Sequence, residues 1–408
     1  MIVIERLGGR ALAVKKNGRN LTRRGAVAAV VTVAAVGIAG CGPSLSMITA
    51  PWSEPQAVVK SKLFGKKNVN FDKVPVVKAV DGQIQQVTVV GPDGERVGGE
   101  LTRGGSAWQI DTSDLDFGTE YTVSVVAVDM RGNPTTAVDS FRTFIPENEL
   151  VATTNIDAGS SYGVGMPLIV TFNSPVANKA EIEERLNVNT NTPEPIVGAW
   201  NWESDTQVTY RPKKYWPANT KVQLNADIKG VNAGNDFYAL DNKREKFSIG
   251  RKFVMIQDSA SKQMKVRKNN KTVRVMPSSS GKPGYETRSG DKVIMSKEQL
   301  VVMDAATLGV SKDDPEYYRL DVNWAMRITW SGEYIHSAPW SVGSQGNANV
   351  SHGCINLAPS NATWLFNQAK IGDPVEVKNT GRTQDLGNGW TMWEESWDEW
   401  KAGSALEA

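Results

Sequence analysis

Histidine and cysteine are scarce in this chain, which has two of each among 408 residues. No CxxC pair is present, and a zinc site built from His336, His352 and Cys354 would need a cramped His-x-Cys spacing. Zinc normally takes four protein ligands in structural sites and three in catalytic ones. We therefore expect no metal, and the sequence points to no other cofactor.

Excess charge of one sign is also missing. The formal net charge is only +2, which argues against nucleic acid as the main partner. The apolar run near the amino terminus, residues 26–39, is shorter than the roughly 20 residues that a membrane-spanning helix needs. A cleaved export signal explains this run better than a membrane anchor does.

The amino terminus, residues 1–41, is typical of a lipoprotein signal. A basic leader precedes the apolar run, which ends in Ile38-Ala39-Gly40-Cys41, a tetrapeptide that resembles a bacterial lipobox. We expect lipidation at Cys41, which would place the protein at the outer face of the cytoplasmic membrane, in the cell wall space. An ordinary signal peptide or an uncleaved anchor are the alternatives. Acylated Cys41 would leave Cys354 without a disulfide partner in its chain.

The three remaining residues of these two types lie between positions 336 and 354. A thiol with imidazoles nearby is the minimum equipment for nucleophilic catalysis, because a base takes the thiol proton and the thiolate attacks. A buried cysteine beside two structural histidines is the alternative. In an extended segment His352 and Cys354 share a face, so sequence proximity alone makes His352 a possible base.

Turn signals and alternating apolar residues predict a mainly β chain of several domains. After a tether at 42–56, we expect two tandem immunoglobulin-like β-sandwiches at 57–147 and 148–250. Tyr121 matches the corner tyrosine of such sandwiches. Neither sandwich contains histidine or cysteine, so spacer or docking roles are expected for both.

A mainly β catalytic domain with few helices is expected at 251–379. Alternation over 324–336 predicts a strand that ends at His336, and residues 303–319 read as a long loop. In the extension at 380–408, four tryptophans recur at helical spacing. They predict a helix whose indole stripe packs on a neighbouring domain; a membrane-surface helix is disfavoured because its polar face is acidic.

The segment from His336, through fourteen intervening residues, to Ser351-His352-Gly353-Cys354-Ile355-Asn356 resembles the active-site signature of YkuD-type L,D-transpeptidases. The flanking stretches resemble the mycobacterial multi-domain lipoprotein members. Residue types, spacing and order all agree, which makes the motif specific.

The resemblance implies that Cys354 is the nucleophile, that His336 is the base, and that the Ser337 carbonyl orients the imidazole. Backbone N–H groups around Gly353 and Cys354 are candidates for stabilising the oxyanion. The resemblance also implies that further residues surround the substrate, in the pocket or in the lid over it. They are His352, Asn356, Tyr318, Met303, Gly332 and Trp340.

The implied activity is 3→3 cross-linking of peptidoglycan stem peptides, with release of D-alanine from a tetrapeptide donor through a cysteine thioester. Carbapenems are the implied covalent inhibitors. A cell-wall carboxypeptidase or amidase would use the same residues with water as acceptor. A non-catalytic wall-binding protein is the third alternative, although it leaves the clustered histidines and cysteine unexplained.

Overall fold

The computed structural model describes residues 56–70 and 75–406. The predicted lipidation site, Cys41, lies outside these residues, as does nearly all of the tether. Within the described ranges, no helix has both the length and the apolar content needed to cross a membrane. The chain is mainly β, as the sequence predicts.

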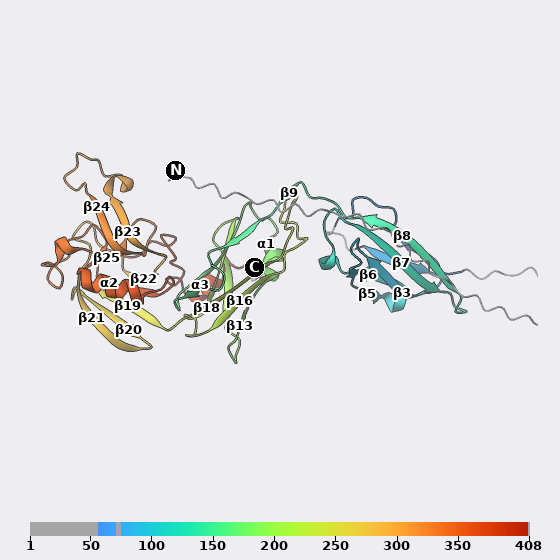
Figure 1. Ribbon diagram of the computed structural model, residues 1–408, viewed down its shortest axis with the longest axis horizontal. Helices are drawn as coiled ribbons and strands as arrows, with labels where there is room; N and C mark the ends of the chain where they lie inside the picture. Colours follow the sequence, from blue (N-terminus) through green and yellow to red (C-terminus); the bar gives the residue numbers. More distant parts are fainter. Residues whose placement is uncertain (1–55, 71–74, 407–408) are drawn as a thin grey trace, which may run out of the picture. The chain divides into compact units, whose positions relative to one another are not determined.

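The first β-sandwich consists of two four-stranded sheets among the described residues, ordered β1-β2-β6-β5 and β4-β3-β7-β8 (Figure 1). The Tyr121 hydroxyl accepts a hydrogen bond of 2.7 Å from the backbone N–H of Asp116, which confirms the predicted corner tyrosine. The elements are β1 (Val58–Ser61), β2 (Val76–Val80), β3 (Gln83–Val90), β4 (Arg96–Val97), β5 (Gly99–Thr102), η1 (Arg103–Gly105), β6 (Ala107–Ile110), η2 (Thr112–Asp114), β7 (Glu120–Val128) and β8 (Pro134–Arg142).

The second sandwich has sheets ordered β10-β12-β15-β14 and β11-β18-β16-β13, with β9 and β17 forming a short pair. Trp216 and Leu224 lie in its core, where apolar burial drives folding. The elements are β9 (Asn148–Glu149), β10 (Ala152–Thr154), β11 (Ser161–Tyr162), β12 (Leu168–Phe172), α1 (Lys179–Glu184), β13 (Leu186–Thr190), β14 (Gly198–Trp202), β15 (Gln207–Pro212), β16 (Lys221–Ala226), β17 (Phe237–Tyr238) and β18 (Lys243–Ile249).

The domain that we expect to be catalytic is built on a nine-stranded sheet ordered β22-β27-β19-β20-β21-β26-β25-β24-β23. Figure 1 shows this sheet in yellow to red with α2 beside it. The elements are β19 (Phe253–Asp258), β20 (Gln263–Lys268), β21 (Lys271–Ser279), β22 (Gly290–Val293), β23 (Ser296–Asp304), η3 (Ala305–Leu308), β24 (Arg319–Arg327), β25 (Tyr334–Ser337), η4 (Pro339–Ser341), β26 (Ile355–Leu357), α2 (Pro359–Gln368) and β27 (Pro374–Lys378).

This sheet must be strongly curved, because its two edge strands are joined directly. Only Ile294 and Met295 separate β22 from β23, and such a link spans roughly 11 Å at most. Nine flat strands at about 4.8 Å spacing would hold the edges roughly 38 Å apart. Ile294 N–H donates to Asp373 beside β27, and Met295 N–H donates to Arg327 of β24, so the two edges meet here.

Two predicted boundaries in this domain are wrong. Met303 belongs to β23 and not to the expected loop, because it pairs with Leu320 of β24 and so extends the hairpin. The expected strand over 324–336 is interrupted between β24 and β25. Residues 328–333 form a turn there, closed by a 2.9 Å hydrogen bond from Glu333 N–H to Thr329 Oγ1.

The predicted tryptophan helix is much shorter than expected. Only α3 (Trp397–Lys401) is helical, so Trp390 and Trp393 lie outside it. Ser396 caps this helix: its hydroxyl accepts from Glu399 N–H, and the Glu399 carboxylate accepts from Ser396 N–H. This capping box sets the first helical residue at Trp397, so the helix does not extend upstream to Trp390 and Trp393.

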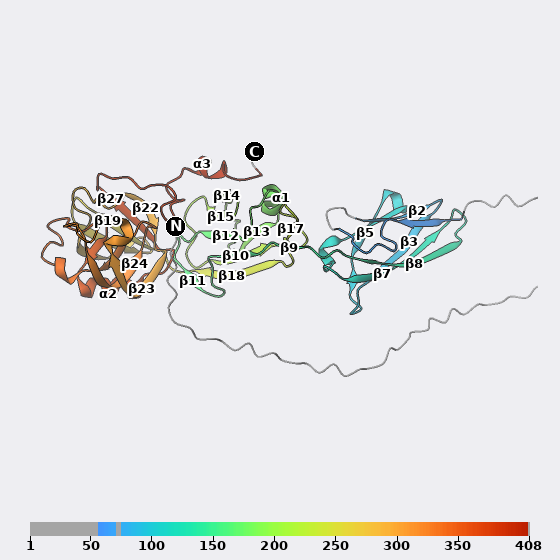
Figure 2. The ribbon, with the colours of Figure 1, turned by 90° about the horizontal axis from the view of Figure 1, so that it is seen from above.

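The tail nevertheless packs on a neighbouring domain, as expected. Its helix α3 lies beside β14 (Figure 2). Trp400 of this helix is buried, and its Nε1 donates to the Ala199 carbonyl at 3.0 Å. The guanidinium of Arg211 lies over three indole rings, with its carbon 5.3 Å from Trp393, 5.4 Å from Trp397 and 4.9 Å from Trp400. Cation–π attraction thus joins the tail to the second sandwich.

Candidate active site

The site is carried by two neighbouring parallel strands, β25 and β26. Ile335 pairs with Ile355, and His336 pairs with Asn356. Both isoleucines belong to the domain core. Because side chains alternate along a strand, His336 and Asn356 then point to the opposite face, and so does Cys354 immediately before β26.

A pocket of about 250 Å³ opens on this face. It brings together residues from β23, β24, β25, β26 and the loops between them. The pocket is lined by Met303, Tyr318, Leu320, Val322, His336, Trp340, Val350, Ser351, His352, Cys354 and Asn356.

His336 is buried, with 3% of its surface exposed. Its Nδ1 lies 2.9 Å from the Ser337 carbonyl oxygen, which only accepts hydrogen bonds, so Nδ1 carries the proton. The Nε2 lone pair is then available as a base. Burial lowers the pKa of His336 to about 4, although the Ser337 carbonyl favours the charged form. The ring is therefore neutral at pH 7.

Cys354 is the free cysteine of the described residues and is buried. Its Sγ lies 3.6 Å from the Gly332 carbonyl oxygen, which accepts from the thiol. Burial raises the pKa of Cys354 to about 12, and the Glu333 carboxylate acts in the same direction, whereas the Tyr334 backbone N–H opposes it. The resting pair is thus a neutral imidazole and a protonated thiol.

The turn that presents the thiol is fixed by hydroxyl groups. Ser351 Oγ donates to the Cys354 carbonyl at 2.6 Å and accepts from Gly353 N–H at 3.2 Å. Thr287 Oγ1 donates to the Gly353 carbonyl at 2.7 Å. Gly353 has φ +119°, a conformation that favours glycine. Its N–H is engaged by Ser351, so binding an oxyanion there requires that bond to be exchanged.

His352 is placed differently from His336. Its Nε2 lies 2.6 Å from the Glu316 carboxylate, which also binds Lys282 Nζ at 2.6 Å. Tyr285 and Tyr318 flank the imidazole, with ring centroids 4.8 and 4.9 Å away. His352 therefore connects the segment before β24 to the turn that carries the thiol.

The structure also places the other predicted pocket residues. Met303, Tyr318, Trp340 and Asn356 line the cavity, while Gly332 reaches the site through its carbonyl. Asn356 Nδ2 donates to Ser341 Oγ at 3.1 Å. Burial raises the pKa of Tyr318 to about 12, so its hydroxyl stays protonated.

Several residues of the site had no recognisable signal in the sequence. Four of them contact the motif from distant segments, and the fifth, Glu333, lies close to His336 in sequence but pairs with the distant Arg288, so neither spacing nor residue type indicated them. They are Lys282, Tyr285, Thr287, Glu316 and Glu333. Across the described part of the chain, no group of three or more His, Cys, Asp or Glu residues has a geometry suited to a metal ion.

Comparison with known families matches both parts of the architecture. The family model of the bacterial Ig domain matches residues 66–232, and that of the YkuD L,D-transpeptidase catalytic domain matches residues 251–377.

Individual L,D-transpeptidases are also similar to this chain in sequence. L,D-transpeptidase 2 of Mycobacterium tuberculosis is 34% identical over 95% of this chain and 97% of its own length. L,D-transpeptidase 1 of the same species is 38% identical over 56% of this chain and 84% of its own. A solved L,D-transpeptidase in complex with imipenem is 37% identical, covering 57% of this chain and 100% of that one, with a TM-score of 0.49. The likeness along nearly the full length of a curated relative shows that this chain belongs to the YkuD-type L,D-transpeptidase family.

Proposed function

We propose that this protein is a cysteine-dependent transpeptidase that forms 3→3 cross-links between peptidoglycan stem peptides. The observation that carries the proposal is the lining of one pocket by Cys354 and His336, with Nδ1 of His336 bound to the Ser337 carbonyl. This arrangement supplies a nucleophile and an oriented base, which is what acyl transfer requires. Family membership supports the choice of stem peptides as substrates.

In the first step, His336 Nε2 takes the Cys354 proton as sulfur attacks the carbonyl carbon of the third residue of a tetrapeptide donor, in the amide bond that joins it to D-alanine. A C–S bond forms, and the C–N bond to the terminal D-alanine breaks. The departing nitrogen takes the proton from His336. The enzyme is left as a thioester with a neutral imidazole.

In the second step, an amine of another stem attacks the thioester. His336 accepts a proton from that amine, a C–N bond forms, and the C–S bond breaks. The thiolate recovers its proton from the imidazole, so the site returns to its resting state. Water in place of the amine would give the hydrolytic alternative.

Mass spectrometry of the full mature protein with a disaccharide-tetrapeptide donor tests the proposal. We expect a thioester on Cys354, free D-alanine, and a cross-linked dimer. Cys354→Ala should abolish all three while it keeps the melting temperature of the wild type. Tripeptide without dimer would make the protein a carboxypeptidase, and an acylated Cys354→Ala variant would refute the nucleophile.

We also propose covalent inhibition by carbapenems, because the same thiol can open a β-lactam ring. Intact mass after addition of imipenem should rise by the mass of one inhibitor molecule, with no such rise for Cys354→Ala. An adduct on the alanine variant would place the reaction elsewhere.

The lipid anchor at Cys41 is a separate proposal, which rests on the lipobox-like tetrapeptide. Cys41→Ser should release the protein from the membrane fraction or leave the precursor unprocessed. The anchor would be refuted if the wild type were found in the soluble fraction with another first residue.

A further inference from the structure

The turn before β25 determines what the resting thiol contacts. Gly332, in this turn, supplies the carbonyl oxygen 3.6 Å from Cys354 Sγ. Glu333 N–H donates to Thr329 Oγ1 at 2.9 Å, which closes the turn. The residues that hold this turn therefore control the orientation of the thiol.

Glu333 ties the turn to a distant segment. Its Oε1 accepts from Arg288 N–H and from Arg288 Nη1, both at 3.0 Å. Glu333 is only 3% exposed, and a buried charge of this kind is costly unless it is paired. Its Cγ also lies 3.6 Å from the point that a Cβ on Gly353 would occupy. Glu333 thus lies against the turn that carries Cys354.

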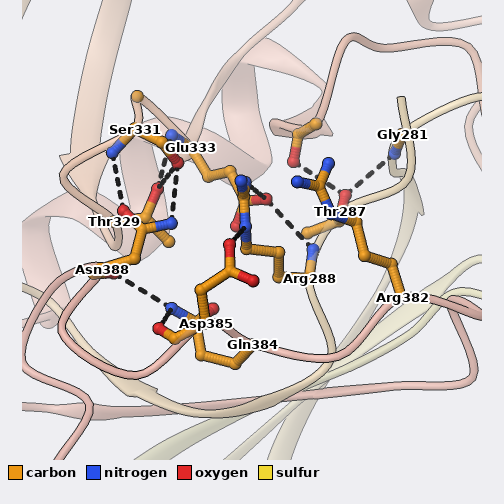
Figure 3. Close-up of polar contacts among 12 residues, drawn as sticks. Gly281, Thr287, Arg288, Thr329, Ser331, Glu333, Arg382, Gln384, Asp385 and Asn388 are labelled. Carbon is orange, nitrogen blue, oxygen red and sulfur yellow. Dashed lines mark hydrogen bonds and ion pairs between the residues drawn. The ribbon is translucent and has the colours of Figure 1, made fainter. Parts of the chain in front are cut away.

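The carboxyl-terminal extension contacts both Arg288 and the turn itself, at Ser331. Asp385 Oδ2 accepts from Arg288 Nε at 2.7 Å. Asn388 Oδ1 accepts from Ser331 N–H, and its Nδ2 donates to Ser331 Oγ, both at 2.9 Å. Figure 3 shows Arg288 between Glu333 and Asp385, with Asn388 beside Ser331 and Thr329.

Backbone contacts hold this part of the extension in register. Ser289 N–H donates to the Arg382 carbonyl at 2.6 Å, and Ser289 forms a parallel bridge with Thr383. The extension therefore reaches the turn as an ordered segment.

We propose that Asp385 and Asn388 are positioning residues for the reaction at Cys354. They act through Arg288, Glu333 and Ser331, which keep the Gly332 carbonyl against the thiol. This inference rests on the proposed function, since it takes Cys354 to be the nucleophile. Neither residue lines the pocket, so the expected effect is on the orientation of sulfur and not on binding.

The test is the kinetics of acylation of the full mature protein by imipenem, followed by loss of β-lactam absorbance. Asp385→Ala and Asn388→Ala should each lower the maximal acylation rate by roughly 5- to 30-fold. This loss is smaller than the roughly 10²-fold loss of rate that can follow displacement of a reacting group by about 1 Å. The half-saturating imipenem concentration should change less than about twofold. A displacement of sulfur by about 1 Å slows its attack on the inhibitor but has little effect on how the inhibitor docks. Asp385→Glu should recover most of the lost rate.

Asp398→Ala is the matched control, because this tail carboxylate is 92% exposed and pairs only with Lys401 among the described ion pairs. It should acylate at the wild-type rate. Asp385 is itself 61% exposed, so Asp385→Ala should fold, and its melting temperature should stay close to that of the wild type.

A double-mutant cycle separates this pathway from a general loss of structure. If Asp385 acts through Arg288, then Asp385→Ala added to Arg288→Met should cause little further loss of rate. Wild-type rates in both alanine variants, or additive losses in the cycle, would overturn the inference while leaving the proposed function intact. A wild-type protein that forms no adduct on Cys354 would instead remove the basis of both.

Discussion

At the scale of single residues, the two histidines of the motif occupy different electrostatic surroundings. His336 has a carbonyl partner on Nδ1 and is buried, whereas His352 contacts the Glu316 carboxylate. The carboxylate engages Nε2 of His352, whereas in His336 the carbonyl engages Nδ1 and leaves the Nε2 lone pair to accept a proton. The local contacts therefore favour His336 as the base.

We predict that His336→Ala lowers the imipenem acylation rate by about 10²–10⁴-fold, the usual contribution of a general base. Because burial lowers the pKa of His336 to about 4, the wild-type rate should persist well below pH 6.5 and fall only as pH approaches 4. Stopped-flow rates across pH check both points. A larger loss in His352→Ala would reverse the assignment.

The same pKa has a consequence for stability. Between about pH 4 and 6.5 the unfolded chain binds a proton at residue 336 that the folded chain does not. The contribution of His336 to the free energy of unfolding should therefore decrease as pH falls through that window. His336→Gln should show a weaker decline in denaturant titrations at pH 6.5, 5.5 and 4.5.

At the scale of elements, the Glu316 carboxylate attaches the segment between η3 and β24 to the turn that carries Cys354. Glu316 binds His352 Nε2 and Lys282 Nζ, each at 2.6 Å. The Lys282 contact, and then that with His352, lowers the pKa of Glu316, so the carboxylate stays charged. Tyr318, two residues later, lines the pocket.

We predict that Glu316→Gln loosens this segment. Amide hydrogen exchange over residues 309–318 should become faster, and the half-saturating donor concentration should rise several-fold because Tyr318 is less well placed. Asp313→Asn, an exposed carboxylate of the same segment, is the control and should match the wild type. Unchanged exchange in Glu316→Gln would show that the Glu316 contacts do not hold this segment.

Sequence patterns predicted those elements whose signals are local. The corner at Tyr121 and the residue types of the His336–Cys354 segment need no knowledge of distant contacts. Partnerships such as Arg288 with Asp385 depend on segments that meet only after folding. No spacing or periodicity encodes them.

The wrong predictions have specific causes. The turn-forming residues that follow Met303 predict a loop from that position onward. In the structure, Met303 pairs with Leu320 and so continues β23. The tryptophan stripe has helical spacing, but the Ser396 cap starts the helix late. In the preceding segment, Trp393 Nε1 donates to the Gly165 carbonyl at 2.9 Å. Tertiary contacts override periodicity there.

At the scale of the whole molecule, the tail joins the catalytic domain to the second sandwich. Trp400 is 1% exposed, and its carbonyl accepts from Asn201 Nδ2 at 2.9 Å. The buried Arg211 guanidinium has Glu395 and Ser396 carbonyls as partners for Nη2. This interface combines a fully buried indole with a cation that donates to two carbonyls of the tail.

We predict that Trp400→Ala lowers the free energy of unfolding by about 3–5 kcal/mol, as for other large buried aromatics. Loss of the indole leaves a cavity against β14 and removes one face of the Arg211 contact. Urea titration followed by tryptophan fluorescence checks the value. Trp330→Ala, at a side chain that is 52% exposed, should cost less than about 1 kcal/mol; similar losses in both variants would contradict the assignment.

The contacts of Asp385 and Asn388 with the turn before β25 also impose an order in time. A polypeptide is synthesised from its amino terminus, so these residues emerge after every residue that lines the pocket. A nascent chain that already contains His336 and Cys354 still lacks the segment that steadies them. Chains cut short after β27 would then carry a complete signature and a poorly oriented thiol, so reactivity is withheld until the segment with Asp385 and Asn388 has been made.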